Sequence, residues 1–192
     1  MILVNKTHLV EEKQLPIQNF RIVQAVDQQD VLIDSKTYQS FQQLQKHLEK
    51  KGIIIGIDGA YRSFRRQAQL YREFVEKYGK DYADQFVAPV GASEHHTGFA
   101  IDISLKEKGR WLSQQDDAMR QEAIFPQIHE ELARFGFILR YPKGKEKITN
   151  YPYEPWHIRY VGKKIADDCR KHQLTLEEYV QKKLCRKEKG CR

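Results

Sequence analysis

Residues 93–102 read Ser-Glu-His-His-Thr-Gly-Phe-Ala-Ile-Asp, and residues 154–157, further along the chain, read Glu-Pro-Trp-His. Together the two segments supply two imidazoles and one carboxylate that can act as metal ligands, from His95, Asp102 and His157. Three protein ligands with one position left for water are the pattern of a catalytic zinc site rather than a structural one. What this chain does therefore depends on whether the two segments meet in space.

The first segment predicts a turn followed by a strand. His95 and Asp102 are seven residues apart, too far for one turn of helix, and Gly98 between them favours a turn. Asp102 falls inside an apolar run, where an aspartate is costly to bury unless it is paired or bound to a metal. We therefore expect the loop to bring His95 back beside Asp102, with a cation at that point.

The second segment adds a third candidate ligand, His157, and a candidate general base, Glu154. A bound zinc ion lowers the pKa of its water from about 15.7 to about 7, and a free glutamate beside that water can relay the proton to a leaving amine. Glu154 lies three residues before His157, an offset that suits this role. Trp156 is expected to pack in the core or to line the cleft.

The other histidines are expected to be ordinary polar residues. His96 should point away from His95, because neighbouring side chains alternate along an extended loop. No motif accompanies the remaining four, which are His8, His47, His129 and His172.

A third segment, residues 58–63, reads Asp-Gly-Ala-Tyr-Arg-Ser and leads from a predicted strand into a predicted helix. Arg62 at this junction can reach a cleft, where its guanidinium would stabilise an oxyanion or hold a carboxylate. The alternative is a surface arginine near a helix N-terminus. Gln67 and Ser93 are weaker candidates on their own: an amide one helical turn after Ser63, and a hydroxyl beside the metal motif.

The length of 192 residues fits a single domain, 1–192, with a substantial core. A hydrophobic content of 40% is that of a globular protein. No apolar run approaches the roughly 18–20 residues of a membrane-spanning helix, and the N-terminus becomes polar too early for a signal peptide. We expect a cytoplasmic protein, or a cell-surface or secreted one if a signal or anchor is missing from this sequence.

The net charge of +7 suits an anionic partner, but much of the excess lies near the end of the chain, including a basic tail, 186–192, that we expect to be mobile. No basic stripe interleaved with aromatics is present, so nucleic acid is not an expected partner. The three cysteines form an odd set without paired spacing, which argues against a disulfide framework.

Hydrophobic periodicity predicts helices and short strands without a regular βαβ alternation, which indicates an α+β domain with a largely antiparallel sheet and the metal site in a cleft at that sheet. Residues 1–34 are expected to wrap around the domain, and the polar segment 106–121 carries no motif. The predicted helices are 35–51, 63–78, 124–135 and one opening at the capping box of 175–178, and the apolar side of the 63–78 helix is expected to face the core. The predicted strands are 2–4, 53–57, 99–103, 137–139 and 156–161.

Three motifs in this order resemble the D-alanyl-D-alanine carboxypeptidase family of zinc metallopeptidases. They are Ser-x-His-x-x-Gly-x-Ala-x-Asp at 93–102, Glu-x-x-His at 154–157 and Tyr-Arg-Ser-x-x-x-Gln at 61–67, and the opening at 3–6 is also similar. The resemblance covers about residues 55–162. It departs from many members at His96, where they have Gln.

The resemblance implies roles for individual residues. It makes His95, Asp102 and His157 the ligands of one zinc ion, Glu154 the catalytic base, and Arg62 the residue that stabilises the transition state. Ser93 and Gln67 match positions that hold the substrate.

The resemblance also implies a substrate class. The chain is most similar to the vancomycin-resistance enzymes that act as both D,D-dipeptidases and D,D-carboxypeptidases, so we expect removal of terminal D-Ala from peptidoglycan precursors or cleavage of D-Ala-D-Ala, in glycopeptide resistance or cell-wall remodelling. Alternatives are an L,D-carboxypeptidase or an endolysin-type peptidase acting on peptidoglycan stem peptides, and a non-catalytic zinc-binding module that binds protein partners. The basic tail could bind an anionic polymer alongside any of these.

Overall fold

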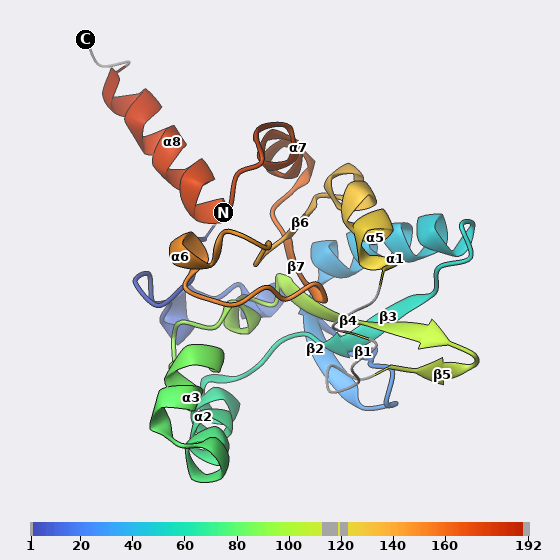
Figure 1. Ribbon diagram of the computed structural model, residues 1–192, viewed down its shortest axis with the longest axis horizontal. Coiled ribbons are helices and arrows are strands. Elements are labelled where there is room, and N and C mark those ends of the chain that lie inside the picture. Colours follow the sequence, from blue (N-terminus) through green and yellow to red (C-terminus); the bar gives the residue numbers. More distant parts are fainter. Residues whose placement is uncertain (1, 113–118, 120–122, 190–192) are drawn as a thin grey trace.

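Helices surround a small antiparallel sheet, as the predicted α+β class requires (Figure 1). The computed structural model describes residues 2–112, 119 and 123–189. The five-stranded sheet has the order β3-β4-β7-β6, with β5 paired to β4, and every pairing in it is antiparallel. Its strands are β3 (Ile55–Gly59), β4 (Ala100–Glu107), β5 (Arg110–Trp111), β6 (Phe137–Leu139) and β7 (His157–Tyr160).

A separate hairpin and several helices complete the described part of the chain. The hairpin pairs β1 (Phe20–Gln24) with β2 (Asp30–Asp34). None of the described helices has the length and apolarity needed to cross a membrane. The α-helices are α1 (Ser35–Glu49), α2 (Phe64–Tyr78), α3 (Lys80–Phe86), α5 (Phe125–Leu132), α6 (Glu146–Thr149), α7 (Lys163–His172) and α8 (Leu176–Lys189).

Local sequence signals place the main helix of the core. The Asp34 carboxylate accepts a hydrogen bond from the backbone N–H of Thr37 and so caps α1 at its first turn. Phe41, Leu44 and Leu48 recur at helical spacing and are fully buried. This face packs with the buried residues of β3, β4 and α5 in one hydrophobic core.

The central strand of the sheet is β4, which pairs with β3, β5 and β7. Ile101 and Ile103 are fully buried in the main core. Asp102 stands between them, directly opposite His157 on β7. The sheet therefore places an acidic and a basic side chain side by side at its centre.

The N-terminal third departs from the sequence prediction. No strand forms at residues 2–4; Val4 instead packs with Val10 and Leu15 in a small separate cluster. The hairpin β1–β2 was not predicted, because most of its side chains remain exposed or half-buried and the hydrophobic alternation is weak. The strand predicted at 53–57 lies at Ile55–Gly59, two residues later.

Several other expectations can be compared with the structure. The helices predicted at 63–78 and 124–135 are present, the second ending in a short 3-10 turn, and the capping box at Thr175 and Glu178 opens α8. The helices α3, α6 and α7 were not predicted. The first part of the polar segment 106–121 forms the β4–β5 hairpin, whereas 113–118, 120–122 and the last tail residues, 190–192, lie outside the described residues.

Helix α2 was predicted to turn its apolar face into the core, and this prediction is wrong. Among the residues of α2 only Gln67 is buried. The helix packs mainly against α3, and the two form a lobe at one end of the molecule (Figure 1). The apolar face of α2 therefore lies outside the main hydrophobic core.

Gly98 joins the loop before β4 to the β1–β2 hairpin. Its φ is +69°, and an added Cβ would lie 2.6 Å from two ring carbons of Phe20 and 3.2 Å from the backbone nitrogen of Asp34. We expect Gly98→Ala to lower the free energy of unfolding by about 2–4 kcal/mol, from backbone strain and overpacking together. Urea denaturation measures this loss.

Gly109→Ala is the matched control, because Gly109 has a φ of +81° and nothing within 4 Å of an added Cβ. It should lose only the strain contribution, about 1–2 kcal/mol. Equal losses in the two variants would show that the contact with Phe20 does not constrain the loop.

Candidate metal centre and active site

Three of the residues that the sequence singled out form one buried cluster. One ligand atom each of His95, Asp102 and His157 lies within 4.8 Å of the other two. His95 Nε2 is 3.2 Å from Asp102 Oδ2, and His157 Nδ1 is 3.0 Å from Asp102 Oδ1. Asp102 and His157 meet because β4 and β7 place them opposite each other, where facing residues are about 4.5–5.5 Å apart.

His95 reaches the cluster from a 3-10 turn, Glu94–Thr97, which Gly98 ends in the left-handed conformation. Its Nδ1 donates to the backbone carbonyl of Ala60 at 2.5 Å. That contact orients the ring and leaves Nε2 as the atom that faces Asp102. The Ala60 carbonyl follows β3, so three strands together determine the geometry of the cluster.

The arrangement of the three side chains suits a bound cation better than a set of hydrogen bonds among the side chains themselves. Asp102 is only 5% exposed, yet its Oδ1 has no hydrogen bond of acceptable geometry despite the short distance to His157. A buried carboxylate is costly without a partner of opposite charge. Although burial opposes ionisation, the imidazoles of His95 and His157 hold the pKa of Asp102 well below its ordinary value. The carboxylate is thus ionised and faces two imidazole nitrogens, a donor set that suits a divalent metal ion.

Glu154 stands beside this cluster with a different environment. Its Oε2 is 3.7 Å from His157 Nδ1, and its side chain keeps 19% exposure. Burial raises the pKa of Glu154 to about 7, and the neighbouring Asp102 carboxylate adds to the rise. A carboxyl group with this pKa can accept a proton and release it again near neutral pH.

Arg62 lines one cavity together with the three cluster residues and Glu154. Its Nη1 donates to Gln67 Oε1 at 3.1 Å, while Gln67 Nε2 donates to the carbonyl of Ala88 at 2.6 Å. Burial lowers the pKa of the Arg62 guanidinium, and the nearby Asp102 and Glu154 carboxylates counteract the fall. The buried glutamine thus holds the arginine in place at the edge of the cluster.

All seven site residues predicted from the sequence line one cavity of about 170 Å³; they are Arg62, Gln67, Ser93, His95, Asp102, Glu154 and His157. Trp156 also lines it, as expected. His96 does not: its ring stacks on Phe64 at 4.0 Å and bonds the carbonyl of Arg62. A larger cavity of about 740 Å³ between the N-terminal segment and α7 contains none of the seven residues.

The sequence did not reveal a group of buried charged side chains next to His157. Glu94 is fully buried and accepts from Arg140 Nε at 2.7 Å, with Arg159 Nη1 2.8 Å away. Its other oxygen lies 3.8 Å from His157 Nε2. Arg140 also donates both Nη atoms to Glu177 of α8. The position of Glu94 inside the His95 motif was the only available signal, because its partners are far away in the sequence.

Two buried tyrosines were also missed. The rings of Tyr141 and His157 are 4.9 Å apart, and Tyr151 packs on Tyr141 at 4.7 Å. Both tyrosines line the cavity. Tyr141 therefore packs against the His157 ring, and Tyr151 supports Tyr141.

Two imidazoles, one ionised carboxylate and a second carboxylate with a raised pKa are the residue set of a metal-dependent hydrolase. Residues 30–163 match the family described as VanY, D-alanyl-D-alanine carboxypeptidase. The chain belongs to this family.

Two curated relatives show the extent of the similarity. The chain is 42% identical over 134 residues to the putative carboxypeptidase YodJ of Bacillus subtilis, covering 70% of this chain and 48% of that protein. It is 34% identical over 182 residues to VanXYC of Enterococcus gallinarum, a bifunctional D-Ala-D-Ala dipeptidase and carboxypeptidase, covering 92% and 91%. The chain therefore spans about half of the first relative and most of the second.

Solved structures give a similar result. The LdcB LD-carboxypeptidase superposes with a TM-score of 0.82 at 35% identity, over 93% of this chain and 84% of that one. A D,D-pentapeptidase, VanY from a VanB-type resistance cassette, in complex with Zn(II), superposes with a TM-score of 0.74 at 30% identity, over 93% and 97%.

The buried charges predict a large effect of a conservative substitution. Glu94→Gln would leave the guanidinium groups of Arg140 and Arg159 without their shared buried carboxylate. Loss of one partner of a buried ion pair costs about 3–5 kcal/mol, so we expect the free energy of unfolding to fall by that amount in urea denaturation.

The control is Glu73→Gln, which removes an exposed pair with Arg66 and should leave stability unchanged within error. A Glu94→Gln protein as stable as the wild type would mean that the guanidinium groups find other compensation.

Proposed function

We propose that this chain is a zinc-dependent D,D-carboxypeptidase and D,D-dipeptidase, which removes terminal D-Ala from peptidoglycan precursors and cleaves D-Ala-D-Ala. The observation that carries the proposal is the convergence of three separate sequence motifs on one cavity. The bifunctional relative VanXYC, matched over most of both chains, supports the substrate class. A role in glycopeptide resistance or in wall remodelling belongs to the same proposal.

In this proposal, His95 Nε2, His157 Nδ1 and an oxygen of Asp102 hold the zinc ion. When bound, zinc would acidify a water molecule and polarise the carbonyl of the bond to be cleaved. The supporting observation is the fit of the donor set, with an ionised buried carboxylate between two imidazole nitrogens. The contact of His95 Nδ1 with the Ala60 carbonyl keeps the required nitrogen free.

Glu154 moves the proton. Its carboxylate accepts a proton from the attacking water as the new C–O bond forms, and it passes that proton to the leaving nitrogen as the C–N bond breaks. The products are a shortened peptide with a new carboxylate and a free D-alanine. A pKa of about 7 suits both halves of this transfer.

Arg62 supplies the positive charge that the reaction needs near the substrate. The guanidinium can face the negative charge that develops on the carbonyl oxygen, or form a bidentate pair with the terminal carboxylate of the substrate. Gln67 holds Arg62 through its amide oxygen. Ser93 and Gln67, both buried in the cavity wall, are proposed to contact the substrate.

A second candidate function is L,D-carboxypeptidase activity on tetrapeptide stems. The similarity to the LdcB LD-carboxypeptidase, with a TM-score of 0.82, favours it. Such an enzyme would use the same metal ligands and the same general base. The side chains that line the cavity would select the configuration of the residue before the cleaved bond. Kinetics on matched peptides separates the two functions.

Substitutions should separate metal binding from proton transfer. We expect Glu154→Gln to lower turnover by about 10²–10⁴-fold while zinc binding measured by calorimetry stays close to that of the wild type. His157→Ala should abolish stoichiometric zinc binding, because only two ligands remain. The exposed His172, at the end of α7, provides the control, since His172→Ala should change neither property.

Near-normal turnover of Glu154→Gln would remove Glu154 from the role of base. Full zinc affinity in His157→Ala would remove His157 from the metal site.

The substrate assignment is tested with three peptides, D-Ala-D-Ala, a pentapeptide ending in D-Ala-D-Ala and the corresponding tetrapeptide. We expect zinc-dependent release of D-Ala from the first two peptides, measured as free D-alanine. Release from the tetrapeptide alone would identify an L,D-carboxypeptidase. Release from none of them, with zinc bound, would contradict both candidate functions.

A further inference from the structure

Four aromatic rings form a continuous run along α2 and α3. The ring centroids of Phe74 and Tyr78 are 5.4 Å apart, those of Tyr78 and Tyr82 are 4.9 Å apart, and those of Tyr82 and Phe86 are 4.4 Å apart. We refer to these four residues as the aromatic ladder. Rings at these distances and tilts support one another.

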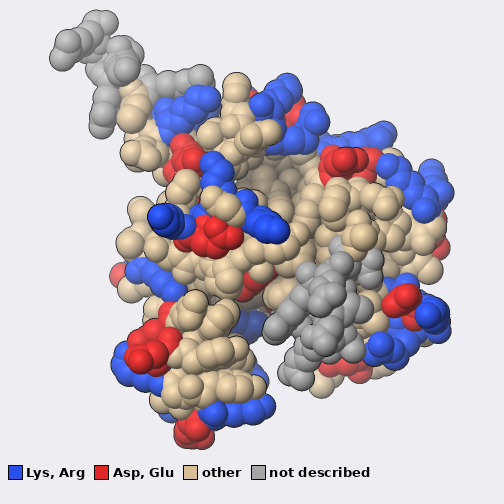
Figure 2. All heavy atoms as spheres, in the orientation of Figure 1, with Lys and Arg blue, Asp and Glu red and all other residues tan. Residues whose placement is uncertain are grey.

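The aromatic ladder is not part of the core. Tyr78, Tyr82 and Phe86 are 47%, 39% and 38% exposed. Their helices pack mainly against each other, apart from the sheet. A cluster of large exposed apolar side chains on one lobe is uncommon for a surface that only meets water, and it marks an interaction site. In Figure 2 the lobe shows a largely uncharged face with charged side chains around its edge.

Two rings of the ladder, the first and the last, line the catalytic cavity. Phe74 and Phe86, together with Leu70, line the same cavity as Arg62 and Gln67. Tyr78 and Tyr82 do not line the cavity, and their rings pack between those of Phe74 and Phe86. The surface is therefore an extension of the substrate site, which identifies its occupant as the part of the substrate that the cavity cannot contain.

We infer that the aromatic ladder binds the stem-peptide segment N-terminal to the cleaved bond, so that the protein favours long peptides over the free dipeptide. This inference rests on the proposed function. A cavity of about 170 Å³ has room for the end of a peptide only. The Phe74 and Tyr82 centroids are also only 6.5 Å apart, so the four rings form a compact patch beside the cavity that the rest of the peptide can contact.

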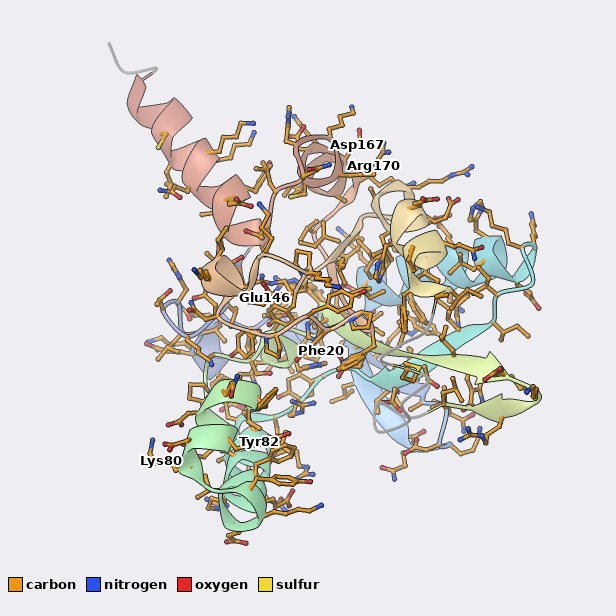
Figure 3. All side chains as sticks on the ribbon, viewed as in Figure 1. Phe20, Lys80, Tyr82, Glu146, Asp167 and Arg170 are labelled. Carbon is orange, nitrogen blue, oxygen red and sulfur yellow. The ribbon has the colours of Figure 1, made fainter. Side chains whose placement is uncertain are left out.

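The positive charge of Lys77 beside Tyr78 suits such a peptide. Lys77 Nζ lies 4.9 Å from the centroid of the Tyr78 ring, which places a cation beside the apolar surface. Lys80 and Tyr82 project from different sides of α3 (Figure 3), and Lys80 pairs with Asp84. Peptidoglycan stems carry a free carboxylate on the glutamate that precedes their third residue, and Lys77 can face it.

The test uses a double variant, Tyr78→Ala with Tyr82→Ala, because neither residue lines the cavity. Its kcat/KM is compared with that of the wild type on D-Ala-D-Ala and on L-Ala-γ-D-Glu-L-Lys-D-Ala-D-Ala. With about 0.5–1.5 kcal/mol for each of the two aromatic contacts, we expect about 5- to 150-fold lower kcat/KM on the pentapeptide, mostly through KM, and unchanged kcat/KM on the dipeptide. Ile22→Ala, at a 64% exposed position on β1, is the control and should alter neither.

Binding separates this inference from the proposed function. In a Glu154→Gln background, calorimetry with the same pentapeptide measures affinity without turnover, and the double substitution should weaken binding by a similar factor. If the wild type releases no D-Ala and the pentapeptide still binds through the ladder, the reaction assignment fails and the inference stands.

Other results would overturn the inference. Equal losses on both substrates, or no loss on either, would show that the ladder is not a peptide subsite. A loss confined to substrates that carry the glycan sugars would assign the ladder to sugar rings instead. A dimer in size-exclusion chromatography that the double substitution converts to a monomer would show that a second copy covers the ladder.

Discussion

The antiparallel register of β4 and β7 is the constraint on which the candidate site depends. It places Asp102 opposite His157 and, on the other edge of β4, opposite Gly59 of β3. A shift of one residue would turn Asp102 to the other face of the sheet and bring a fully buried isoleucine to the site. The buried isoleucines on either side of Asp102 therefore hold the register and the ligand geometry together.

Buried charge extends from this sheet to distant parts of the chain. Glu94 joins the 3-10 turn that carries His95 to Arg140 and Arg159, and Arg140 continues to Glu177 at the start of α8. Burial opposes ionisation of Glu94, but the two guanidinium groups hold its pKa well below the ordinary value. Burying any one of these charged side chains without its partners costs free energy. The carboxylates and guanidinium groups are therefore stable in the interior only as a complete set. The C-terminal helix is in this way connected to the residue beside His157.

Sequence patterns predicted the elements with strong local signals. Helix α1 has core residues at helical spacing, and α2 begins at Ser63, a good N-cap, so both were located within two residues. The hairpin β1–β2 escaped prediction because it is held by pairing across a turn, with little burial of its own. The wrong assignment of the α2 face has a similar origin: periodicity shows that a helix has an apolar side, but it does not show what that side meets.

The two described cysteines, Cys169 and Cys185, are free thiols. Lysines and arginines in Figure 2 lie among acidic residues over the visible face, without one continuous basic patch.

By itself the sequence determined which side chains are candidates for the chemistry, because the residue types and their spacing within each motif limit what the side chains can bind or transfer. It thus identified the two imidazoles, the two carboxylates and the arginine of the cavity. Only the tertiary structure decided that these groups meet, that Glu94 and its two arginines lie next to His157, and that an aromatic surface adjoins the cavity. These relations join residues far apart in the chain, and contacts of that kind depend on strand register and helix packing, which no local pattern encodes.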